Sequence, residues 1–316
     1  MSTTTGDPGL SIKKLQGSPR RKRKEAFVRG ILFTAAGISL VVSVAIVLAL
    51  IGQTVNFLTK IDLSQLWTSG WFPRDGEYDI PTILIGTVEV SVIAMVIAAP
   101  LGLGAAMYLS EYASPRTRRR LKPILETLAG IPSVVLGYFA LQVINPNIVQ
   151  DLMGATPTFT IMAAGIAVGI LIIPLVASVA EDAMYAVPNA LREAAYGIGA
   201  RRRTVTIKVV FPAAVSGIMA SLILGFSRAL GETMIVAIAA GASGGAIRHW
   251  NPLEPGQTMT GAISSLAIGS DQVKSSSASE ANPFDALYFV GLLLFVMTLA
   301  MNMLSERFVR RVRKEY

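Results

Sequence analysis

The sequence has 316 residues but no cysteine and only one histidine, His249. The absence of cysteine excludes disulfide bonds and thiolate metal sites. A single histidine disfavours both a zinc site built from several imidazoles and a histidine-dependent catalytic triad. The chain also lacks the G-x-x-x-x-G-K-[ST] and H-E-x-x-H sequences that bind nucleotide phosphates and zinc. We therefore expect a protein that is not an enzyme and has no metal or cofactor of its own, so that energy must come from a gradient or from another chain.

Charged residues are scarce as well. They make up 15% of the chain, against about 25% in a typical soluble protein. Hydrophobic residues make up 52%, and the mean hydropathy is +0.56. So little charge cannot cover the surface of two globular domains, and the high hydrophobicity disfavours a disordered chain. The composition therefore indicates a membrane protein.

Six apolar segments are long enough to cross a bilayer, whose core of about 30 Å needs about 20 apolar residues in a helix. They comprise residues 30–52, 82–109, 123–144, 159–179, 214–240 and 286–304. The sequence thus predicts an all-α polytopic membrane protein with six transmembrane helices within residues 30–311. A basic segment, residues 1–29, precedes this domain, and a short tail, residues 312–316, follows it. The apolar run 259–268 is too short to span, so we expect it to lie in the interface or to re-enter the membrane.

Basic residues alternate in number between successive connections. Twenty-three of the 28 lysines and arginines fall in the N-terminal segment, in the connections 110–122 and 180–208, and after residue 304. The other connections hold four, and Arg228 lies inside a segment. By the positive-inside rule, both termini and these two connections are cytoplasmic. We interpret the basic cluster 20–24 as a topology signal with added contact to anionic lipid, and not as a nucleic-acid-binding arm.

The first outer connection, residues 53–81, is rich in aromatic residues, namely Trp67, Trp71, Phe72 and Tyr78. Such residues are typical of an aromatic belt at the membrane surface. The alternative is a surface that docks an external partner. His249 and Trp250 lie in the last outer connection, where we expect a surface or interfacial role.

The cytoplasmic connection 180–212 is predicted to contain a short amphipathic helix. Pro188 suits the beginning of a helix, and Gly199 allows a left-handed turn that ends it. Between them, apolar residues at helical spacing form one face: Leu191, Ala194, Ala195 and Ile198. The small alanines would let this helix enter the groove of a partner protein.

The same connection resembles the coupling loop of ABC importer permeases. The matching positions are Glu193, Ala194, Ala195, Gly199, Val209, Phe211 and Pro212; the family usually has Ile and Leu where this chain has Val209 and Phe211. The resemblance implies the type I (MetI-like) permease fold. It also implies that a separate ATPase subunit receives the loop in a cleft, with coupling residues Leu191, Glu193, Ala194, Ala195, Gly199 and Pro212.

The fifth apolar segment contains two charged residues, Arg228 and Glu232. A charge at mid-bilayer costs at least about 2.5–3.5 kcal/mol, so such residues are functional candidates. Four residues apart, they share a helix face, which Ser221 and Gly225 extend toward the cytoplasm. The pair is either a buried structural ion pair or part of a substrate path made of Arg228, Glu232, Ser227, Thr233 and Ser221. In a path, the planar fork of arginine suits an oxyanion.

Several further blocks look like those of the phosphate-specific ABC importer permeases, and the PstC type in particular. They are residues 128–137, 227–234, 251–259 and 287–302. The resemblance implies a permease subunit of an ATP-driven importer of inorganic phosphate in the bacterial cytoplasmic membrane. It further implies three partners: a second permease (PstA type), an ATPase dimer (PstB type) that binds ATP and magnesium, and an extracytoplasmic phosphate-binding protein (PstS type).

Two other functions remain open at the level of the sequence. The chain could be a permease for another oxyanion, such as molybdate or sulfate. In a different class, it could be a gradient-driven carrier or a membrane scaffold.

Overall fold

The computed structural model describes residues 19–241, 245–269 and 282–312. The predicted helical architecture is confirmed, and the strands among these residues are three short ones. Within these described ranges, four helices are long and apolar enough to cross a membrane, or up to six if each of two bent helix pairs is one span. Most of the predicted segment 1–29 and residues 313–316 of the tail lie outside the described residues. The chain divides into two compact units, residues 1–50 and 51–316.

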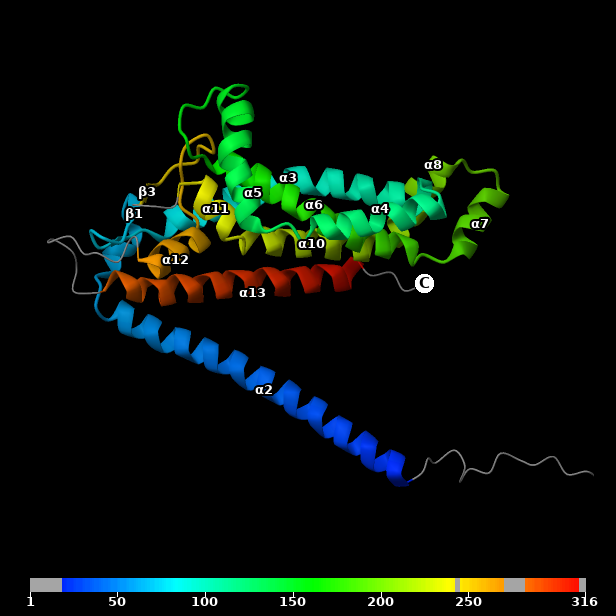
Figure 1. Cartoon of the computed structure of the whole chain (residues 1–316), viewed down its shortest axis with the longest axis horizontal. Helices are drawn as coiled ribbons and strands as arrows, with labels where there is room; N and C mark the ends of the chain where they lie inside the picture. The colour runs from blue at the N-terminus through cyan, green and yellow to red at the C-terminus, as the bar shows by residue number, and fades with distance from the viewer. Residues whose placement is uncertain (1–18, 242–244, 270–281, 313–316) are drawn as a thin grey trace, which may run out of the picture. The chain divides into compact units, whose positions relative to one another are not determined.

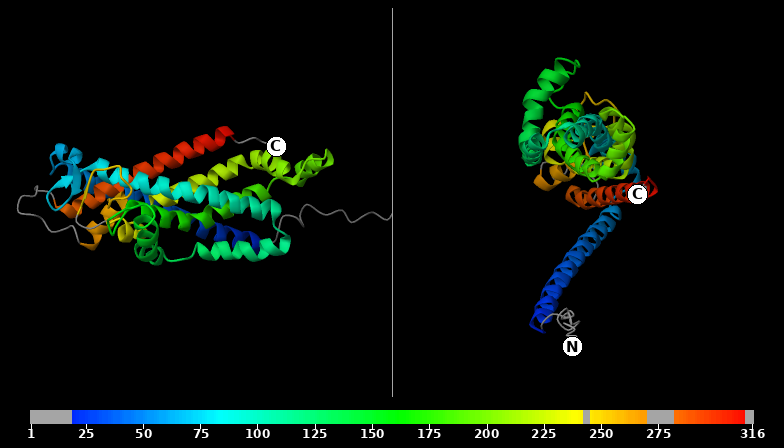
Figure 2. Two further views of the ribbon diagram at one scale, coloured as in Figure 1. Left: turned by 90° about the horizontal axis from the view of Figure 1, so that it is seen from above. Right: turned by 90° about the vertical axis from the view of Figure 1, so that its right-hand side faces the viewer.

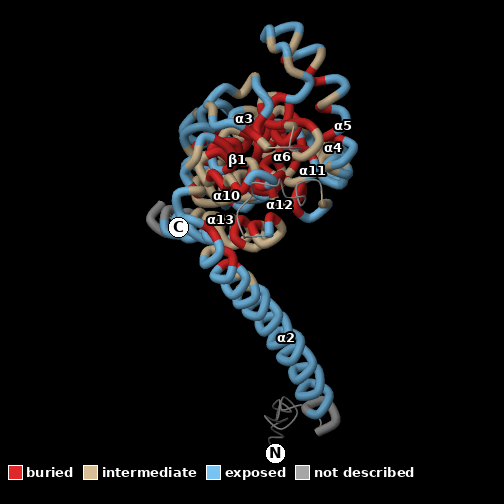
Figure 3. Tube along the Cα trace, turned by 90° about the vertical axis from the view of Figure 1, so that its left-hand side faces the viewer, coloured by how far each residue is buried: buried red, intermediate tan, exposed pale blue. Residues whose placement is uncertain are grey.

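Helix α2 (Pro19–Leu58) provides the whole described part of the first unit. It is longer at both ends than the predicted segment 30–52. Every described side chain from residue 23 to residue 46 is exposed, including Phe33, Leu40 and Ile46 (Figure 3). A helix that is apolar on all sides is stable when lipid or another protein surrounds it.

Three helices form the centre of the second unit: α3 (Ile80–Met107), α6 (Ile161–Tyr185) and α10 (Val215–Leu230). They lie side by side in Figure 1, and α6 contributes a continuous series of buried residues, from Ile161 to Val176, to one hydrophobic cluster of the core. Small residues permit the close approach. A Cβ atom on Gly165 would lie 2.7 Å from Ile93 Cβ, so only glycine permits α3 and α6 to approach this closely here.

Two predicted segments are broken in the structure. Segment 123–144 corresponds to α4 (Pro115–Leu128), α5 (Ser133–Phe139) and the π-helix η3 (Ala140–Gln150), with a bend of 82°. Pro132 accounts for this break, because proline disfavours the helical conformation in the residue before it. Helix α4 also takes up part of the basic connection 110–122, which is therefore mostly helical.

Segment 214–240 is interrupted as well. Helix α10 ends at Leu230, and α11 (Met234–Ala239) begins after three non-helical residues. Before it, α8 (Arg202–Val205), the π-helix η4 (Thr206–Val210) and α9 (Phe211–Ala213) lead into α10 through a bend of 72°. The charged pair thus lies at a break and not on one continuous helix.

The two long outer connections come together at one end of the second unit. Strands β1 (Gly70–Phe72), β2 (Glu77–Tyr78) and β3 (Ala246–Ile247) form an antiparallel sheet in the order β2-β1-β3. The predicted aromatic belt is wrong for Trp71 and Tyr78, which are fully buried and pack edge to face. Helix α12 (Met259–Ile268) is buried in the same cluster, together with residues of α13 (Ala286–Val312).

The predicted coupling loop occupies the opposite end. Helix α7 (Asn189–Gly197) and α8 lie there, far from β1, β3 and α12, in Figure 1 and in the view from above in Figure 2. The second unit therefore separates the two sets of connections that the charge pattern assigns to opposite sides of the membrane.

Candidate functional site

Arg228 and Glu232 meet across the break in the fifth segment. Arg228 lies in the last turn of α10, where a cation favours the helix dipole. Its Nη1 atom is 3.0 Å from Glu232 Oε2, and the side chains are 49% and 3% exposed, respectively. This oxygen of Glu232 has no well-aligned hydrogen bond to any described residue. The pair thus joins a half-exposed guanidinium to a buried carboxylate.

The break itself is held by α12. The hydroxyl of Thr260 donates a hydrogen bond to the backbone oxygen of Glu232, at 2.7 Å. Thr260 is buried, and no sequence pattern predicts that it lies near Glu232, 28 residues away. The Thr233 hydroxyl donates to the Gly231 carbonyl at 3.3 Å. The short helix therefore positions the carboxylate of the charged pair.

The two predicted path serines lie in different environments. Ser227 Oγ donates to Asn302 Oδ1 of α13 at 2.9 Å, so it lies beside Arg228 and links two helices. Ser221 is buried and donates to the Ile218 carbonyl of its own helix. The structure thus brings Ser227, Thr233 and the charged pair to one region, while Ser221 lies nearer the start of α10. Its place in the path stays a prediction.

A second ion pair lies at the end of the second unit that carries the three strands. Asp79 is buried at the N-cap of α3 and accepts hydrogen bonds from the backbone nitrogen and hydroxyl of Thr82, at 3.0 and 2.6 Å. Arg248 Nε donates to the same carboxylate at 3.1 Å. This hydrogen bond raises the pKa of Arg248 above its usual value. One ion pair therefore fastens the last outer connection to the start of α3.

Helix α7 confirms part of the predicted local structure of the coupling loop. It begins directly after Pro188, and Gly199 adopts a left-handed conformation with φ of 82°. Ala195 is buried and Leu191 packs beside it, whereas Ala194 and Ile198 are exposed, Ile198 by 87%. The predicted apolar face is therefore divided in burial. Leu191 and Ala195 hold the helix on the protein, and Ala194 and Ile198 stay exposed.

The other residues that are predicted to couple to the ATPase lie partly at the surface and partly against the hydrophobic cluster. Glu193 and Gly199 are exposed, as is Pro212 at the start of α9. Val209 and Phe211 pack against the cluster that also contains Ala195. The loop thus offers an exposed edge that includes Glu193, Ala194 and Ile198, above a packed base.

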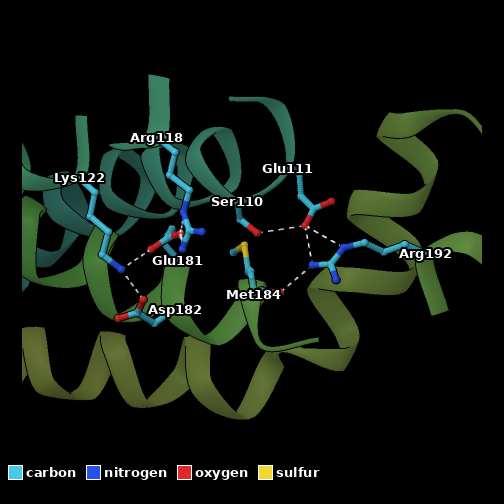
Figure 4. A network of polar contacts seen from close by, with 8 residues as sticks. All are labelled: Ser110, Glu111, Arg118, Lys122, Glu181, Asp182, Met184 and Arg192. Carbon is cyan, nitrogen blue, oxygen red and sulfur yellow. Dashed lines mark hydrogen bonds and ion pairs between the residues drawn. The ribbon is translucent and has the colours of Figure 1, made fainter. Parts of the chain in front are cut away.

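Arg192 connects α7 to the rest of the protein, as Figure 4 shows. Its Nη2 atom donates to Glu111 Oε1 at 2.9 Å and to the Met184 carbonyl at 2.8 Å, while Nη1 donates to the Val187 carbonyl. Glu111 lies in the π-helical turn η2 (Tyr108–Tyr112) that continues α3. Neither residue stands out in the sequence, because a pair 81 residues apart leaves no periodic signal.

A second network lies next to it in Figure 4. Arg118 Nε and Lys122 Nζ, both on α4, donate to the two carboxylate oxygens of Glu181 at 2.6 and 2.8 Å. Lys122 also contacts Asp182. Lys122 thus pairs across to another helix, although Glu126 lies one turn along its own. Arg118 and Lys122 fasten α4 to α6.

Comparison with known proteins identifies the family. The model of the binding-protein-dependent transport system inner membrane component matches residues 98–314. The chain belongs to this family.

Curated relatives match between two thirds and nearly all of the chain. The probable ABC transporter permease YqgH of Bacillus subtilis is 32% identical over 296 residues, which is 92% of this chain and 93% of the relative. The phosphate transport permease PstC of Xylella fastidiosa is 29% identical over 315 residues, or 94% of each. PstC of Mesorhizobium japonicum is 34% identical over 225 residues, 66% of this chain and 69% of the relative. The predicted resemblance to phosphate permeases is thus confirmed.

Solved transporters share the fold. A chain of the bacterial alginate ABC transporter, solved with its alginate-bound periplasmic protein, matches with a TM-score of 0.62 and 16% identity, covering 92% of this chain and 98% of that one. A chain of the inward-facing methionine transporter MetNI matches with a TM-score of 0.51 and 17% identity, over 72% and 92%. The type I ABC importer permease fold is therefore confirmed, and the chain is a permease subunit of an ABC importer.

Proposed function

We propose that this permease is the PstC-type subunit of an ATP-driven importer of inorganic phosphate. The relatives named PstC support the substrate, and one structural observation supports an anion path. This observation is the half-exposed guanidinium of Arg228 in an apolar segment. A cation in such a segment is costly unless it is used.

The geometry of the pair suits transient binding of an anion. Nη1 of Arg228 faces Glu232, and no other described residue forms an ion pair or a hydrogen bond with this guanidinium, so its other N–H groups can donate to phosphate. Glu232 neutralises the cation while the path is empty, so that the anion is not held too tightly. Its carboxylate can also accept a hydrogen bond from a protonated phosphate oxygen.

The proposal includes the rest of the importer. A second, PstA-type permease completes the path, an ATPase dimer binds ATP and magnesium and receives the exposed edge of α7, and a phosphate-binding protein delivers the substrate outside. Both termini are cytoplasmic. Closure of the ATPase on ATP opens the path outward, phosphate enters, and hydrolysis resets the permease.

Uptake by reconstituted vesicles tests this proposal. Vesicles that contain both permeases and the ATPase, supplied with the binding protein, should take up labelled phosphate when ATP is present. Arsenate should compete, and sulfate and molybdate should not. Competition by sulfate or molybdate would favour another oxyanion, and uptake without the ATPase would favour a gradient-driven carrier.

Substitution of Arg228 tests the path. Arg228→Ala should lower uptake by at least about tenfold, because loss of a charged hydrogen-bonding partner costs about 2–5 kcal/mol. Assembly with the ATPase should persist. Uptake at the normal rate in Arg228→Ala would show that the pair is structural only.

A further inference from the structure

The polar contacts of α7 converge on one side chain, Arg192. Its guanidinium reaches η2 through Glu111 and the end of α6 through the Met184 carbonyl (Figure 4). It also donates to Asn189 Oδ1 at 3.3 Å within α7. Helices α3 and α6 form the largest helix contact of the second unit. A single residue thus joins the loop helix to two of the three central helices, α3 and α6.

The pair is nearly buried. The side chains of Glu111 and Arg192 are 4% and 13% exposed, and Ser110 Oγ donates a further hydrogen bond to Glu111 at 3.0 Å. Charge-assisted hydrogen bonds with several partners fix the orientation of a side chain strongly. A polar cavity of about 370 Å³ borders the pair, lined in part by Tyr196 and Arg202. On this side α7 is therefore held by its charges and not by apolar packing.

The backbone alone holds α7 loosely. Three residues, 186–188, separate it from α6, and α7 has nine residues. Isolated helices of fewer than about 12 residues are marginal in water, so their position depends on tertiary contacts. The apolar contacts of Leu191 and Ala195 provide one such contact. The ion pair of Arg192 with Glu111 provides a second contact, which also fixes the orientation of the helix.

We infer that Arg192 is a positioning residue, which transmits movement of α7 to α3 and α6 through Glu111 and the carbonyl groups at the end of α6. The inference rests on the proposed function, in which the ATPase moves α7. Arg192 points inward, opposite to the exposed edge that the ATPase receives. Loss of the pair should therefore separate ATP hydrolysis from transport, while the ATPase still binds.

Four variants of the complete importer in vesicles test the inference: Glu111→Gln, Arg192→Gln, the double variant, and Arg203→Gln. Arg192→Gln alone leaves a buried carboxylate unpaired, which destabilises a protein, so the double variant is the cleaner test. Arg203 is an exposed arginine of the same loop and controls for loss of charge.

The measured quantity is phosphate taken up per ATP hydrolysed. We expect at least an approximately fivefold decrease in the double variant, as for a typical coupling between two sites, with normal co-purification of the ATPase. The double variant should be no worse than the more severe single one, because both break one link. Arg203→Gln should match the unmodified importer. An unchanged ratio in the double variant, or loss of ATPase binding in proportion to uptake, would overturn the inference.

Hydrogen exchange separates this inference from the proposed function. In the purified chain, the double variant should raise exchange of the α7 amides by at least about tenfold, since a helix without its tertiary contacts opens locally. Amides in the middle of α3 should not change. If the unmodified importer takes up no phosphate, the proposed function fails, and this measurement alone decides the inference. Unchanged exchange in α7 would overturn it.

Discussion

At the scale of the residue, Glu232 combines burial with a half-exposed partner. Thr260 holds its backbone, and Arg228 is its charged neighbour. Removal of the carboxylate charge leaves the hydrogen bond from Thr260 in place, because that bond involves the backbone oxygen. The roles of the backbone and of the charge can thus be separated by one isosteric substitution.

Glu232→Gln should therefore change transport without unfolding the break. With Arg228 no longer neutralised in the empty path, phosphate should bind more tightly and leave more slowly. Both KM and the maximal rate of uptake should fall, as measured in vesicles over a range of phosphate concentrations. Thr260→Val, which removes the hydroxyl bond and keeps the charge, is the matched control and should not lower KM. An unchanged KM in Glu232→Gln would contradict the neutralising role.

Asp79 offers a second prediction at this scale. Asp79→Ala removes the cap of α3 and should lower the free energy of unfolding by about 1 kcal/mol from capping alone. Asp79→Asn keeps an N-cap acceptor and should lie between the two proteins. Thermal unfolding in detergent measures the difference, and equal effects of the two substitutions would contradict a role in capping.

The pair of Asp79 with Arg248 should not respond to alkaline pH. A basic group with a raised pKa stays charged to higher pH, and its contribution is lost only when the pH rises through that raised value. Because the pKa of Arg248 is already raised from that of an ordinary arginine, unfolding between about pH 7 and 9 should show no loss from this pair.

At the scale of the element, helix α7 and the contact of α3 with α6 depend on particular glycines. Gly199, just after α7, has a φ of 82°, which other residues rarely adopt. Gly197 has no such φ, and nothing lies within 4 Å of a Cβ atom placed on it. On α6, a Cβ atom on Gly165 would press on Ile93, whereas one on Gly104 of α3 would meet nothing. Gly197 is therefore the control for Gly199, and Gly104 is the control for Gly165.

Gly199→Ala should strain the turn by about 1–2 kcal/mol and displace the end of α7. We expect weaker co-purification of the ATPase subunit. Gly197→Ala should be neutral or slightly stabilising, because alanine favours a helix over glycine. Equal ATPase binding by the two variants would contradict the importance of the left-handed turn.

Gly165→Ala should destabilise the contact of α3 with α6 by about 1–3 kcal/mol, the usual cost of overpacking. Thermal unfolding in detergent should show a lower Tm than for Gly104→Ala. A Tm equal to that of the control would mean that α3 and α6 can separate without cost.

The sequence predicted which segments are apolar and long better than it predicted where their helices are broken. Segment 214–240 is apolar enough for one helix, yet it is broken after Leu230. The break lies at Gly231 and is held by a hydrogen bond from Thr260, which composition does not reveal. Tertiary contacts decide such points, as they do for Trp71, which enters a sheet made from two distant connections. Gly199 was predictable because its conformation depends on local chemistry. The pair of Glu111 with Arg192 was not, because it depends on how α3 and α7 meet.

At the scale of the whole molecule, the two ends of the second unit carry different connections. Helix α7 lies at one end and the sheet at the other (Figures 1 and 2). The charge pattern predicts that the α7 end is cytoplasmic. Since the chain has no cysteine, a single introduced thiol reports the position of one site.

Ile198→Cys and Ile247→Cys test this orientation. Both residues are exposed, on the two opposite ends. A membrane-impermeant maleimide added to intact cells should label Ile247→Cys and should label Ile198→Cys only after the membrane is opened. The reverse pattern would contradict the predicted topology.

Helix α2 has a consequence for how the protein is inserted into the membrane during its synthesis. The side chains of residues 26–46 are exposed along the helix, and a basic cluster at 20–24 precedes them. The positive-inside rule predicts that such a segment inserts with its basic end in the cytoplasm. Because it is the first apolar segment to be synthesised, we expect it to set the direction in which the later segments are threaded.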